Sequence, residues 1–403
     1  MYSLILKPGK EKSLLRRHPW IFSGAVERVK GDPAPGDMVR VVTASGTFLA
    51  QAAFSPQSRI RARVWTWSER ETVDEAFFCR RLQAAMAERK CLPGFGDPRG
   101  ALRLVHGESD GLPGVTVDRY ADTLVLALTS AGAEHWREVI AALLPAVTGC
   151  ARVYERSDAE VRGLEGLEAR TGALGGGEPP AFIEIAEAGP SPLVFRVDVR
   201  GGQKTGFFLD QRDNRGLVSR LARGGNVLDG FCYTGGFALA AARGGAASVL
   251  ALDSSAEALA RARENLAANG LPESAVEWRE ADVFQALRQL RDQGRRFDLV
   301  VLDPPKFAPT AALVERAARA YKDINLLAFK LLHPGGALAT FSCSGAIDPD
   351  LFQKIVAGAA LDAGVQARVE QRLMAAADHP VALNFPEGEY LKGLVCRIRP
   401  DGA

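Results

Sequence analysis

Two short segments in the C-terminal half carry side chains that could do chemistry on a nucleic-acid base. Cys343 lies between two serines directly after the apolar run Ala337–Phe341, and Asp303 opens the sequence Asp-Pro-Pro-Lys-Phe after a second apolar run. A cysteine thiolate can add to carbon 6 of a pyrimidine, which makes carbon 5 able to attack a sulfonium methyl group. An acid held rigidly by two prolines can hydrogen-bond the exocyclic amine or a ring nitrogen of a base. A plain strand-ending turn is the alternative interpretation of Asp303.

A third segment, Leu228–Phe237, reads Leu-Asp-Gly-Phe-Cys-Tyr-Thr-Gly-Gly-Phe and follows an expected strand. Its paired glycines allow a sharp turn and a close approach to a ligand. The segment matches neither the GxGxxG of dinucleotide enzymes nor the GxxxxGK[ST] phosphate loop, so NAD and a phosphate-cradling loop are disfavoured. A tightly packed helix start is the alternative. We expect this segment to bind an organic cofactor through four residues: Asp229, Phe231, Thr234 and Gly235.

Four further polar residues are candidates for cofactor contacts, and Asp303, described above, is one of them. Asp253 ends the next expected strand and suits bidentate hydrogen bonds to ribose hydroxyls, with a helix cap as the alternative. Asp282 could accept from an adenine amino group or cap the helix that follows. Gln211 lies in Gly201–Arg212, whose polar and aromatic residues suggest a flap over the cofactor or, equally, a capped surface helix with a loop.

The C-terminal half is expected to hold these residues on a parallel α/β sheet. From about Phe182 strands and helices alternate, which is typical of that fold class. Ligands bind outside the carboxyl ends of the strands in such sheets, where Asp303 and Cys343 would lie. The last two expected strands are close in sequence and predict an antiparallel hairpin. The seven expected strands are Asn226–Leu228, Val249–Leu252, Val276–Arg279, Asp298–Leu302, Ala337–Phe341, Ala367–Leu373 and Gly393–Arg397.

The N-terminal part is expected to be mostly β and to bind a polyanion. Residues 1–75 read as short strands and turns, with a hairpin signal at Ser45–Gly46. Residues 1–90 hold 16 Lys and Arg against 9 Asp and Glu, whereas the remainder holds 34 against 39. A basic module on a mildly acidic body favours RNA as a partner, and a solvated basic face is the alternative.

One strand in this part has a pattern that suggests an RNA-facing surface. From Arg59 to Trp67 the residues alternate, so three arginines and two tryptophans fall on one face. Arginine would contact phosphates and tryptophan would stack on bases. An ordinary half-buried strand with a solvated cationic face is the alternative. The candidate RNA-binding residues are Arg59, Arg61, Arg63, Lys12, Arg16 and Arg17.

The chain length and the distribution of cysteines limit the possible domain number, location and metal content. A chain of 403 residues is expected to form two or three domains. The sequence shows no apolar run of membrane-helix length, and we expect neither a membrane helix nor a secretory signal. The six cysteines are scattered without a CxxC pair, so we expect no zinc or other metal, and free thiols in a cytosolic protein. Five are expected to be small buried residues: Cys79, Cys91, Cys150, Cys232 and Cys396.

Between these two parts we expect a small α+β unit. Glu69–Lys90 has helical spacing, and Ala101–Leu128 reads as strands around a long turn. The clearest boundary is Arg170–Pro180, with its three consecutive glycines.

With these residues in view, the chain resembles the ribosomal large-subunit methyltransferase I family over nearly its whole length. The resemblance is carried by Gly9–Gly24, Gly107–Gly114, Lys204–Arg212, Phe231–Phe237, Asp303–Phe307, Ser342–Gly345 and Ala377–Pro380. It implies a PUA-like RNA-binding domain over residues 1–75, a central α+β domain over 76–180, and a Rossmann-like, seven-stranded methyltransferase domain over 181–403. It also implies S-adenosylmethionine as the methyl donor, 23S rRNA as the partner, and a cytoplasmic location without a membrane.

The resemblance further implies that Cys343 is the nucleophile that makes 5-methylcytosine. Many RNA cytosine-5 methyltransferases have a second cysteine after the Asp-Pro-Pro-type motif, but here Lys306 and Phe307 occupy that stretch. The base that takes the carbon-5 proton is therefore open, with Asp303 and Lys306 as candidates.

Two alternatives stand beside this interpretation. A guanine-N methyltransferase would also carry an Asp-Pro-Pro motif but would not need Cys343. A non-catalytic RNA-binding protein could keep a methyltransferase-like fold, although the set of aspartates argues against it. The oligomeric state is open, with a dimer as one option.

Overall fold

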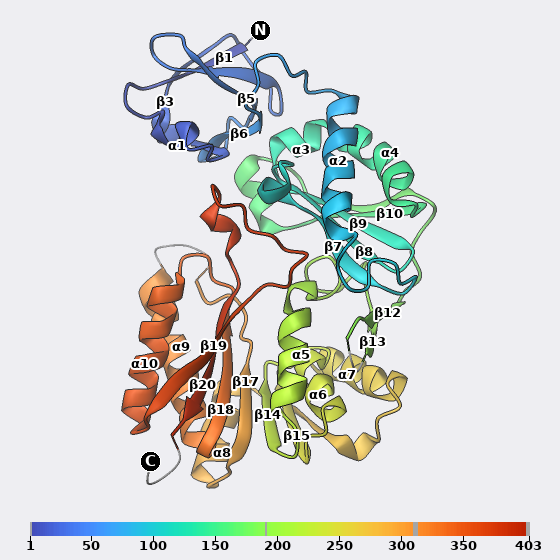
Figure 1. Ribbon diagram of the computed structural model, residues 1–403, viewed down its shortest axis with the longest axis vertical. Coiled ribbons are helices and arrows are strands. Elements are labelled where there is room, and N and C mark those ends of the chain that lie inside the picture. The colour runs from blue at the N-terminus through green and yellow to red at the C-terminus, as the bar shows by residue number, and fades with distance from the viewer. Residues whose placement is uncertain (1, 190–191, 309–312, 400–403) are drawn as a thin grey trace. The chain divides into compact units, whose positions relative to one another are not determined.

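The computed structural model describes residues 2–189, 192–308 and 313–399, and the chain divides into two compact units (Figure 1). Unit 1 comprises Met1–Ala186, Val197–Leu209 and Ala377–Gly388. Unit 2 comprises Glu187–Arg196, Asp210–Ala376 and Glu389–Ala403. Each unit is thus built from segments that are far apart in sequence. The domain limits at residues 75 and 180 stay a proposal.

Unit 1 begins with a six-stranded sheet in the order β2-β6-β5-β4-β1-β3. Buried aliphatic residues from its strands and from the short helix α1 (Lys12–Leu15) form its core. The expected hairpin is confirmed: β4 and β5 pair antiparallel, and Gly46 has the positive φ of 88° that the turn requires. The strands are β1 Tyr2–Leu6, β2 Trp20–Phe22, β3 Val26–Lys30, β4 Met38–Val42, β5 Phe48–Phe54 and β6 Ile60–Thr66.

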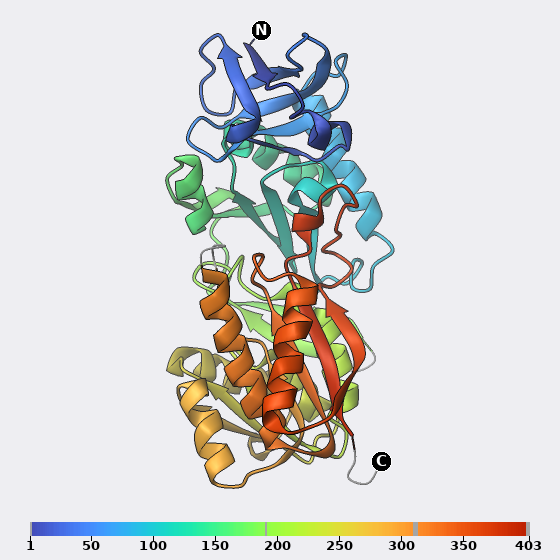
Figure 2. The ribbon, with the colours of Figure 1, turned by 90° about the vertical axis from the view of Figure 1, so that its left-hand side faces the viewer.

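A second sheet of unit 1 has the order β11-β10-β9-β8-β7 and packs against helices (Figure 2). Its strands are β7 Ala101–His106, β8 Val115–Tyr120, β9 Thr123–Leu128, β10 Arg152–Ser157 and β11 Arg170–Gly175. The helices are α2 Glu75–Arg89, α3 Ala131–His135 and α4 Arg137–Thr148. The segment Arg170–Pro180, expected as a boundary, contains β11, which pairs antiparallel with β10. Backbone pairing needs no side chain, so a glycine-rich segment can still form an edge strand.

Unit 2 contains the expected seven-stranded sheet, in the order β16-β15-β14-β17-β18-β20-β19. All pairs from β16 to β18 are parallel, and the predicted C-terminal hairpin β19–β20 is antiparallel. The strands are β14 Asn226–Gly230, β15 Ser248–Asp253, β16 Val276–Glu280, β17 Phe297–Leu302, β18 Leu332–Ser342, β19 Ala367–Met374 and β20 Lys392–Ile398. The strand predictions are confirmed with ends shifted by a few residues. A separate two-stranded sheet pairs β12 (Ile183–Glu187) with β13 (Leu193–Val197).

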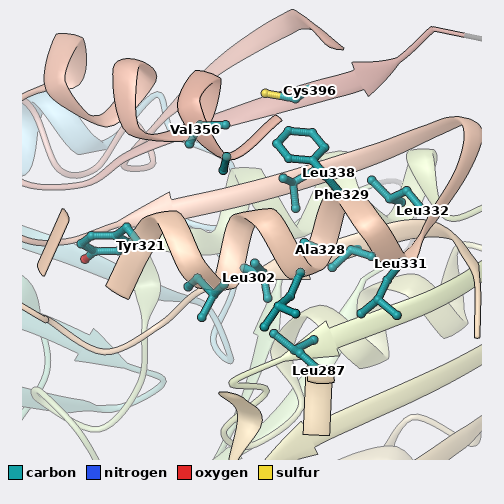
Figure 3. Packing of buried hydrophobic residues seen from close by; sticks show 14 of the residues in the cluster. Leu287, Leu302, Tyr321, Ala328, Phe329, Leu331, Leu332, Leu338, Val356 and Cys396 are labelled. Atoms are coloured by element: carbon teal, nitrogen blue, oxygen red, sulfur yellow. The ribbon is translucent and has the colours of Figure 1, made fainter. Parts of the chain in front are cut away.

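Helices cover both faces of the seven-stranded sheet because alternate strand residues point to opposite sides. Leu228, Val300 and Leu338 pack with α8, α9 and α10, whereas Val227 and Leu299 pack with α5, α6 and α7. Figure 3 shows the first of these cores, in which Tyr321, Ala328 and Phe329 of α9 are labelled. The helices are α5 Arg212–Leu221, α6 Gly236–Arg243, α7 Ala256–Ala268, α8 Val283–Asp292, α9 Val314–Leu331 and α10 Pro349–Ala363. None of the described helices is long and apolar enough to cross a membrane.

The expected burial of the five other cysteines is only partly correct. Cys232 and Cys396 are buried, Cys79 and Cys150 are half-buried, and Cys91 is exposed. Cys91 follows the end of α2 in a turn-rich segment, where no layer covers it.

Candidate functional site

Unit 2 brings the carboxyl ends of four parallel strands together, and each end carries a candidate residue. Asp229 lies near the end of β14, and Asp253 ends β15. Asp303 directly follows β17, and Cys343 directly follows β18. Because β14 pairs with both β15 and β17, and β17 pairs with β18, these residues share one edge of the sheet. This is where ligands bind in doubly wound sheets.

The loop after β14 has a backbone that is suited to a close ligand contact. Phe231 and Tyr233 have positive φ values of 67° and 48°, which is uncommon outside glycine. Gly235 has φ 86°, and a Cβ there would lie 2.6 Å from a Leu239 carbon. The turn is held by the Cys232 N–H, which donates to the Leu252 carbonyl at 3.0 Å. Such strained positions gather at ligand sites, and they begin α6 with its N–H groups directed back toward the strand ends.

Asp229 is the most buried acid of the group, with 1% of its surface exposed. Its carboxylate oxygens accept no hydrogen bond of ordinary geometry from the described residues, and the Ala238 backbone only weakly favours the ionised form. Burial, and after it the carboxylates of Asp303 and Asp253, raises the pKa of Asp229 well above its usual value. A cationic donor on a ligand, such as an ammonium group, would satisfy a buried carboxylate of this kind.

Asp253 organises the loop as well as the strand end. Its Oδ2 accepts from the Tyr233 N–H at 2.8 Å, and its Oδ1 accepts from the Ser255 N–H at 2.9 Å. The cap of α7 is Ser255, whose hydroxyl accepts from the Ala258 N–H. Asp253 is therefore not the helix cap. Each carboxylate oxygen keeps one lone pair for a hydroxyl donor, so the ribose contact stays a prediction.

Asp282 does cap a helix, which is the alternative role that the sequence left open. Its Oδ1 accepts from the Gln285 N–H at 2.9 Å at the start of α8, and its side chain is exposed. An adenine contact would have to use its other oxygen, and this contact remains a prediction.

Gln211 connects the segment before α5 with the Asp303 loop. It is buried, and its Nε2 donates to Asp303 Oδ2 at 3.0 Å while its Oε1 accepts from Asn214 at 2.6 Å. The Thr234 carbonyl is fixed in turn by Asn265 Nδ2 at 3.0 Å. The polar candidates are thus held by neighbours on the helices rather than by the strands alone.

A polar network that the motifs alone did not indicate surrounds Cys343. The half-buried Cys343 lies between the buried Ser342 and Ser344, and the hydroxyls of both serines bond the Tyr321 hydroxyl at 3.0 and 3.1 Å. The Ser344 hydroxyl also accepts from the Ala308 N–H at 3.2 Å, which ties this loop to the segment after Asp303. Burial raises the pKa of Tyr321, so it stays protonated and can donate.

Lys392 is the second residue of this network that sequence reasoning missed. It begins β20, opposite Ser342, and it is 4% exposed. Its ammonium group donates to the carbonyls of Ser344 and Ile347 at 2.8 and 2.7 Å. The signal in the sequence is a lysine at the start of the mostly apolar strand Lys392–Ile398, where a charge needs a specific reason to be buried.

The expected RNA-facing strip on β6 requires a correction. Arg63 is 7% exposed and pairs with Glu165 at 2.9 Å, and Trp65 is 2% exposed. Arg61 is half-buried and donates to the Pro56 carbonyl, so only Arg59 is fully exposed among the three arginines. The face that carries them packs partly against the second sheet of unit 1, whose core includes Trp65. Period-two alternation shows which side a residue takes but not what covers that side.

The other basic candidates in unit 1 are accessible. Lys12, Arg16 and Arg17 are exposed on α1 and directly after it. The Arg17 guanidinium lies 5.1 Å from the ring centroid of Trp67, which is half-buried. A cationic surface with an adjacent aromatic ring suits contact with RNA phosphates and bases, and RNA binding by these residues stays a prediction.

Comparisons with known proteins agree with this arrangement. A family profile described as S-adenosylmethionine-dependent methyltransferase matches residues 170–382, and a PUA-like domain profile matches residues 4–67. A protein of Shewanella amazonensis named ribosomal RNA large subunit methyltransferase I is 52% identical over 393 residues, which is 98% of each chain. A protein of the same name from Cronobacter sakazakii is 50% identical over 395 residues, or 98% of this chain and 99% of that one.

Two solved structures share the fold over the whole chain. A putative methyltransferase from Streptococcus mutans superposes with a TM-score of 0.85 at 22% identity, over 98% of this chain and all of that one. A putative methyltransferase complexed with SAH gives 0.87 at 23% identity, with the same coverage. At these identities the likeness concerns the fold.

Proposed function

The chain belongs to the ribosomal RNA large subunit methyltransferase I family, and from this premise we propose that it methylates carbon 5 of a cytosine in 23S rRNA. S-Adenosylmethionine is its methyl donor. The observation that supports cytosine is the position of Cys343 at the end of β18, beside the strand that leads to Asp303. A thiol at that place serves pyrimidine carbon-5 chemistry and has no role in methylation of a guanine nitrogen.

The residues at the strand ends fit the donor. The buried carboxylate of Asp229 would hold the ammonium group of the methionine part, which supplies the cation that its oxygens need. Asp253 would accept from the ribose hydroxyls, and Phe231, Thr234, Gly235 and Asp282 would line the rest. When bound, the donor supplies an electrophilic methyl group on a sulfonium.

The proposed reaction begins at the Cys343 sulfur. The thiolate forms a bond to carbon 6 of cytosine, and the electrons of the carbon 5–carbon 6 double bond become available at carbon 5. Carbon 5 would then accept the methyl group that the donor supplies. Transfer of the carbon-5 proton to a base would restore the double bond and expel the Cys343 thiolate.

Asp303 has two proposed tasks. Its carboxylate would accept from the exocyclic amine of cytosine, which orients the ring over Cys343. Gln211 donates to Asp303 Oδ2 at 3.0 Å, and this bond fixes the orientation of the whole carboxylate, including Oδ1. Asp303 and the exposed Lys306 are the candidates for the base that removes the carbon-5 proton.

RNA would be bound by unit 1 through its first sheet and α1. The PUA-like match covers residues 4–67, which contain the exposed Lys12, Arg16, Arg17 and Arg59. Phosphate contacts from these groups would supply affinity, and base contacts in unit 2 would supply the chemistry.

A mechanism-based trap tests the proposal. A 23S rRNA fragment that carries 5-fluorocytosine at the target should form a denaturation-resistant adduct with the enzyme, because fluorine cannot leave as a proton does. The adduct should require S-adenosylmethionine for full yield, and Cys343→Ala should abolish both adduct and activity with cofactor affinity near normal. Cys91→Ala, a change at an exposed cysteine, is the matched control and should trap normally.

The result that overturns the proposal is methylation by Cys343→Ala at a rate comparable with the wild type. Nucleoside mass spectrometry would then identify the product. A methylguanosine would put the guanine-N alternative in first place.

A further inference from the structure

A buried cation lies next to the proposed nucleophile, and nothing in the reaction described so far uses it. Lys392 is 4% exposed, and its ammonium group donates to the carbonyls of Ser344 and Ile347. Both carbonyls belong to the loop that begins at Cys343. In the antiparallel register Lys392 lies opposite Ser342, the residue directly before Cys343. The lysine side chain is therefore hydrogen-bonded to the cysteine loop, and its backbone lies beside the strand that leads into that loop.

A buried ammonium group is costly unless an anion accompanies it. Two carbonyl oxygens satisfy two of its three donors but supply no net negative charge. Among the described residues, no carboxylate lies within ion-pair distance of the Lys392 ammonium. The Cys343 thiol, at the start of the loop that Lys392 contacts, is a nearby group that can become an anion, and its charge acts on Lys392 ahead of those of Glu389 and Asp348.

The electrostatics of this corner agree with that pairing. Burial lowers the pKa of Lys392, and the charge of Cys343 is the first of the effects that oppose the lowering, ahead of Glu389 and Asp348. Lys306 adds a weaker repulsion. The Tyr321 hydroxyl, from α9, faces the same loop, and its pKa is raised mainly by burial and further by the charge of Cys343.

We propose that Lys392 is a positioning residue that keeps the Cys343 sulfur in its thiolate form, by placing a buried ammonium charge beside it and by clamping its loop through two carbonyls. A free cysteine thiol titrates near ~8.5, so an unassisted nucleophile would be mostly protonated at neutral pH. Lys392 favours ionisation of the Cys343 thiol, and the sequence motifs did not reveal this residue. The proposal rests on the role of Cys343 proposed above.

The test measures the ionisation of Cys343 directly. Iodoacetamide alkylation rates for the Cys343 peptide, resolved by mass spectrometry from about pH 6 to 10, give the apparent pKa of that thiol alone. We expect a wild-type value below that of a free cysteine, a rise of about one unit or more in Lys392→Met, and a smaller rise in Lys392→Arg. Lys322→Met removes a surface lysine of α9 that pairs with Asp362, and it should leave the value unchanged.

An unchanged Cys343 pKa in folded Lys392→Met would overturn the proposal. If that variant does not fold, Cys343→Asp and Cys343→Asn give the same information from the other partner. With a cation in place the aspartate variant should melt no lower than its neutral isostere at neutral pH. A clearly lower melting temperature for Cys343→Asp would show that no cation stabilises an anion at this position.

These measurements need no RNA, so they separate the inference from the proposed function. If the pKa of the Cys343 thiol depends on Lys392 but no 5-fluorocytosine adduct forms, the cytosine mechanism is refuted and the role of Lys392 is retained. If the adduct forms but the pKa of the thiol is the same with and without Lys392, only the role of Lys392 is refuted.

Discussion

Gln211 Nε2 donates a 3.0 Å hydrogen bond to Asp303 Oδ2 across 92 residues of sequence. The bond joins the segment before the first sheet strand to the Asp-Pro-Pro loop after the fourth. The Gln211 amide is itself oriented by Asn214, which donates to its oxygen, and it in turn orients the Asp303 carboxylate. If Asp303 acts on the substrate as proposed, its carboxylate is held in place before the substrate binds.

Gln211→Ala should therefore lower kcat more than it weakens cofactor binding. Loss of one hydrogen bond to a carboxylate corresponds to about 1.5–3 kcal/mol, or roughly ten- to a hundredfold in rate if the bond matters only in the transition state. Single-turnover kinetics and calorimetry with S-adenosylmethionine would separate the two effects. Equal kcat in the variant would mean that Asp303 is held adequately without Gln211.

Asp229→Asn should stabilise the ligand-free protein while impairing its use of the cofactor. The raised folded-state pKa means that the folded protein holds this proton more tightly than the unfolded chain does. Stability from this site is therefore full below the unfolded pKa of ~3.9 and is lost as pH rises through the folded pKa. The neutral amide avoids that loss, so the melting temperature of the apo variant at neutral pH should be higher by a few degrees.

The same variant should bind S-adenosylmethionine at least about tenfold more weakly, because the ammonium group loses its buried counter-charge. Thermal shift with and without cofactor measures both effects in one experiment. A variant that is less stable and binds normally would remove Asp229 from the cofactor site.

Asp253→Ala should also weaken cofactor binding by at least about tenfold, through the loss of ribose hydrogen bonds of about 1.5–3 kcal/mol each. The structure adds a second consequence, since the Tyr233 and Ser255 N–H groups lose their acceptor. Asp253→Asn keeps an acceptor for one of them and should fall between the wild type and the alanine variant. Unchanged affinity by calorimetry in Asp253→Ala would refute the ribose assignment.

For RNA, the combined change of Lys12, Arg16 and Arg59 to alanine should lower affinity and flatten its salt dependence. Each lost phosphate contact should reduce the slope of log affinity against log salt by about 0.7–0.9. Cofactor binding should be untouched. The matched control removes three exposed cations of unit 2, namely Arg263, Arg316 and Lys354. An equal loss in the control would mean that net charge alone, and not the surface of unit 1, binds RNA.

Arg63→Ala should behave differently, as a stability variant. It removes the partner of Glu165, whose side chain is 1% exposed. Breaking a buried ion pair from one side costs about 3–5 kcal/mol, because the remaining charge stays buried. Chemical denaturation should show this loss. A variant of normal stability with weakened RNA binding would restore Arg63 to the RNA surface.

The seven strands and the positions of the candidate acids at their ends could be predicted from the sequence because they follow from local pattern. Alternating apolar strands and helices specify a parallel sheet, and a polar residue after each strand must then lie at one edge. Asp282 marks a limit of this reasoning. A carboxylate before a helix serves as a cap and as a ligand contact with the same sequence signature, and only its hydrogen bond to Gln285 shows that the cap is made.

The sequence by itself determined the family, the seven-stranded sheet, and the order in which Asp229, Asp253, Asp303 and Cys343 reach its edge. Tertiary structure alone decided what surrounds each of them. Arg63 became a buried partner of Glu165 because a second sheet covers that face of β6, and Lys392 reached the Cys343 loop because β20 pairs antiparallel beside β18. Burial and charge pairing depend on neighbours that are distant in sequence, and local periodicity carries no information about them.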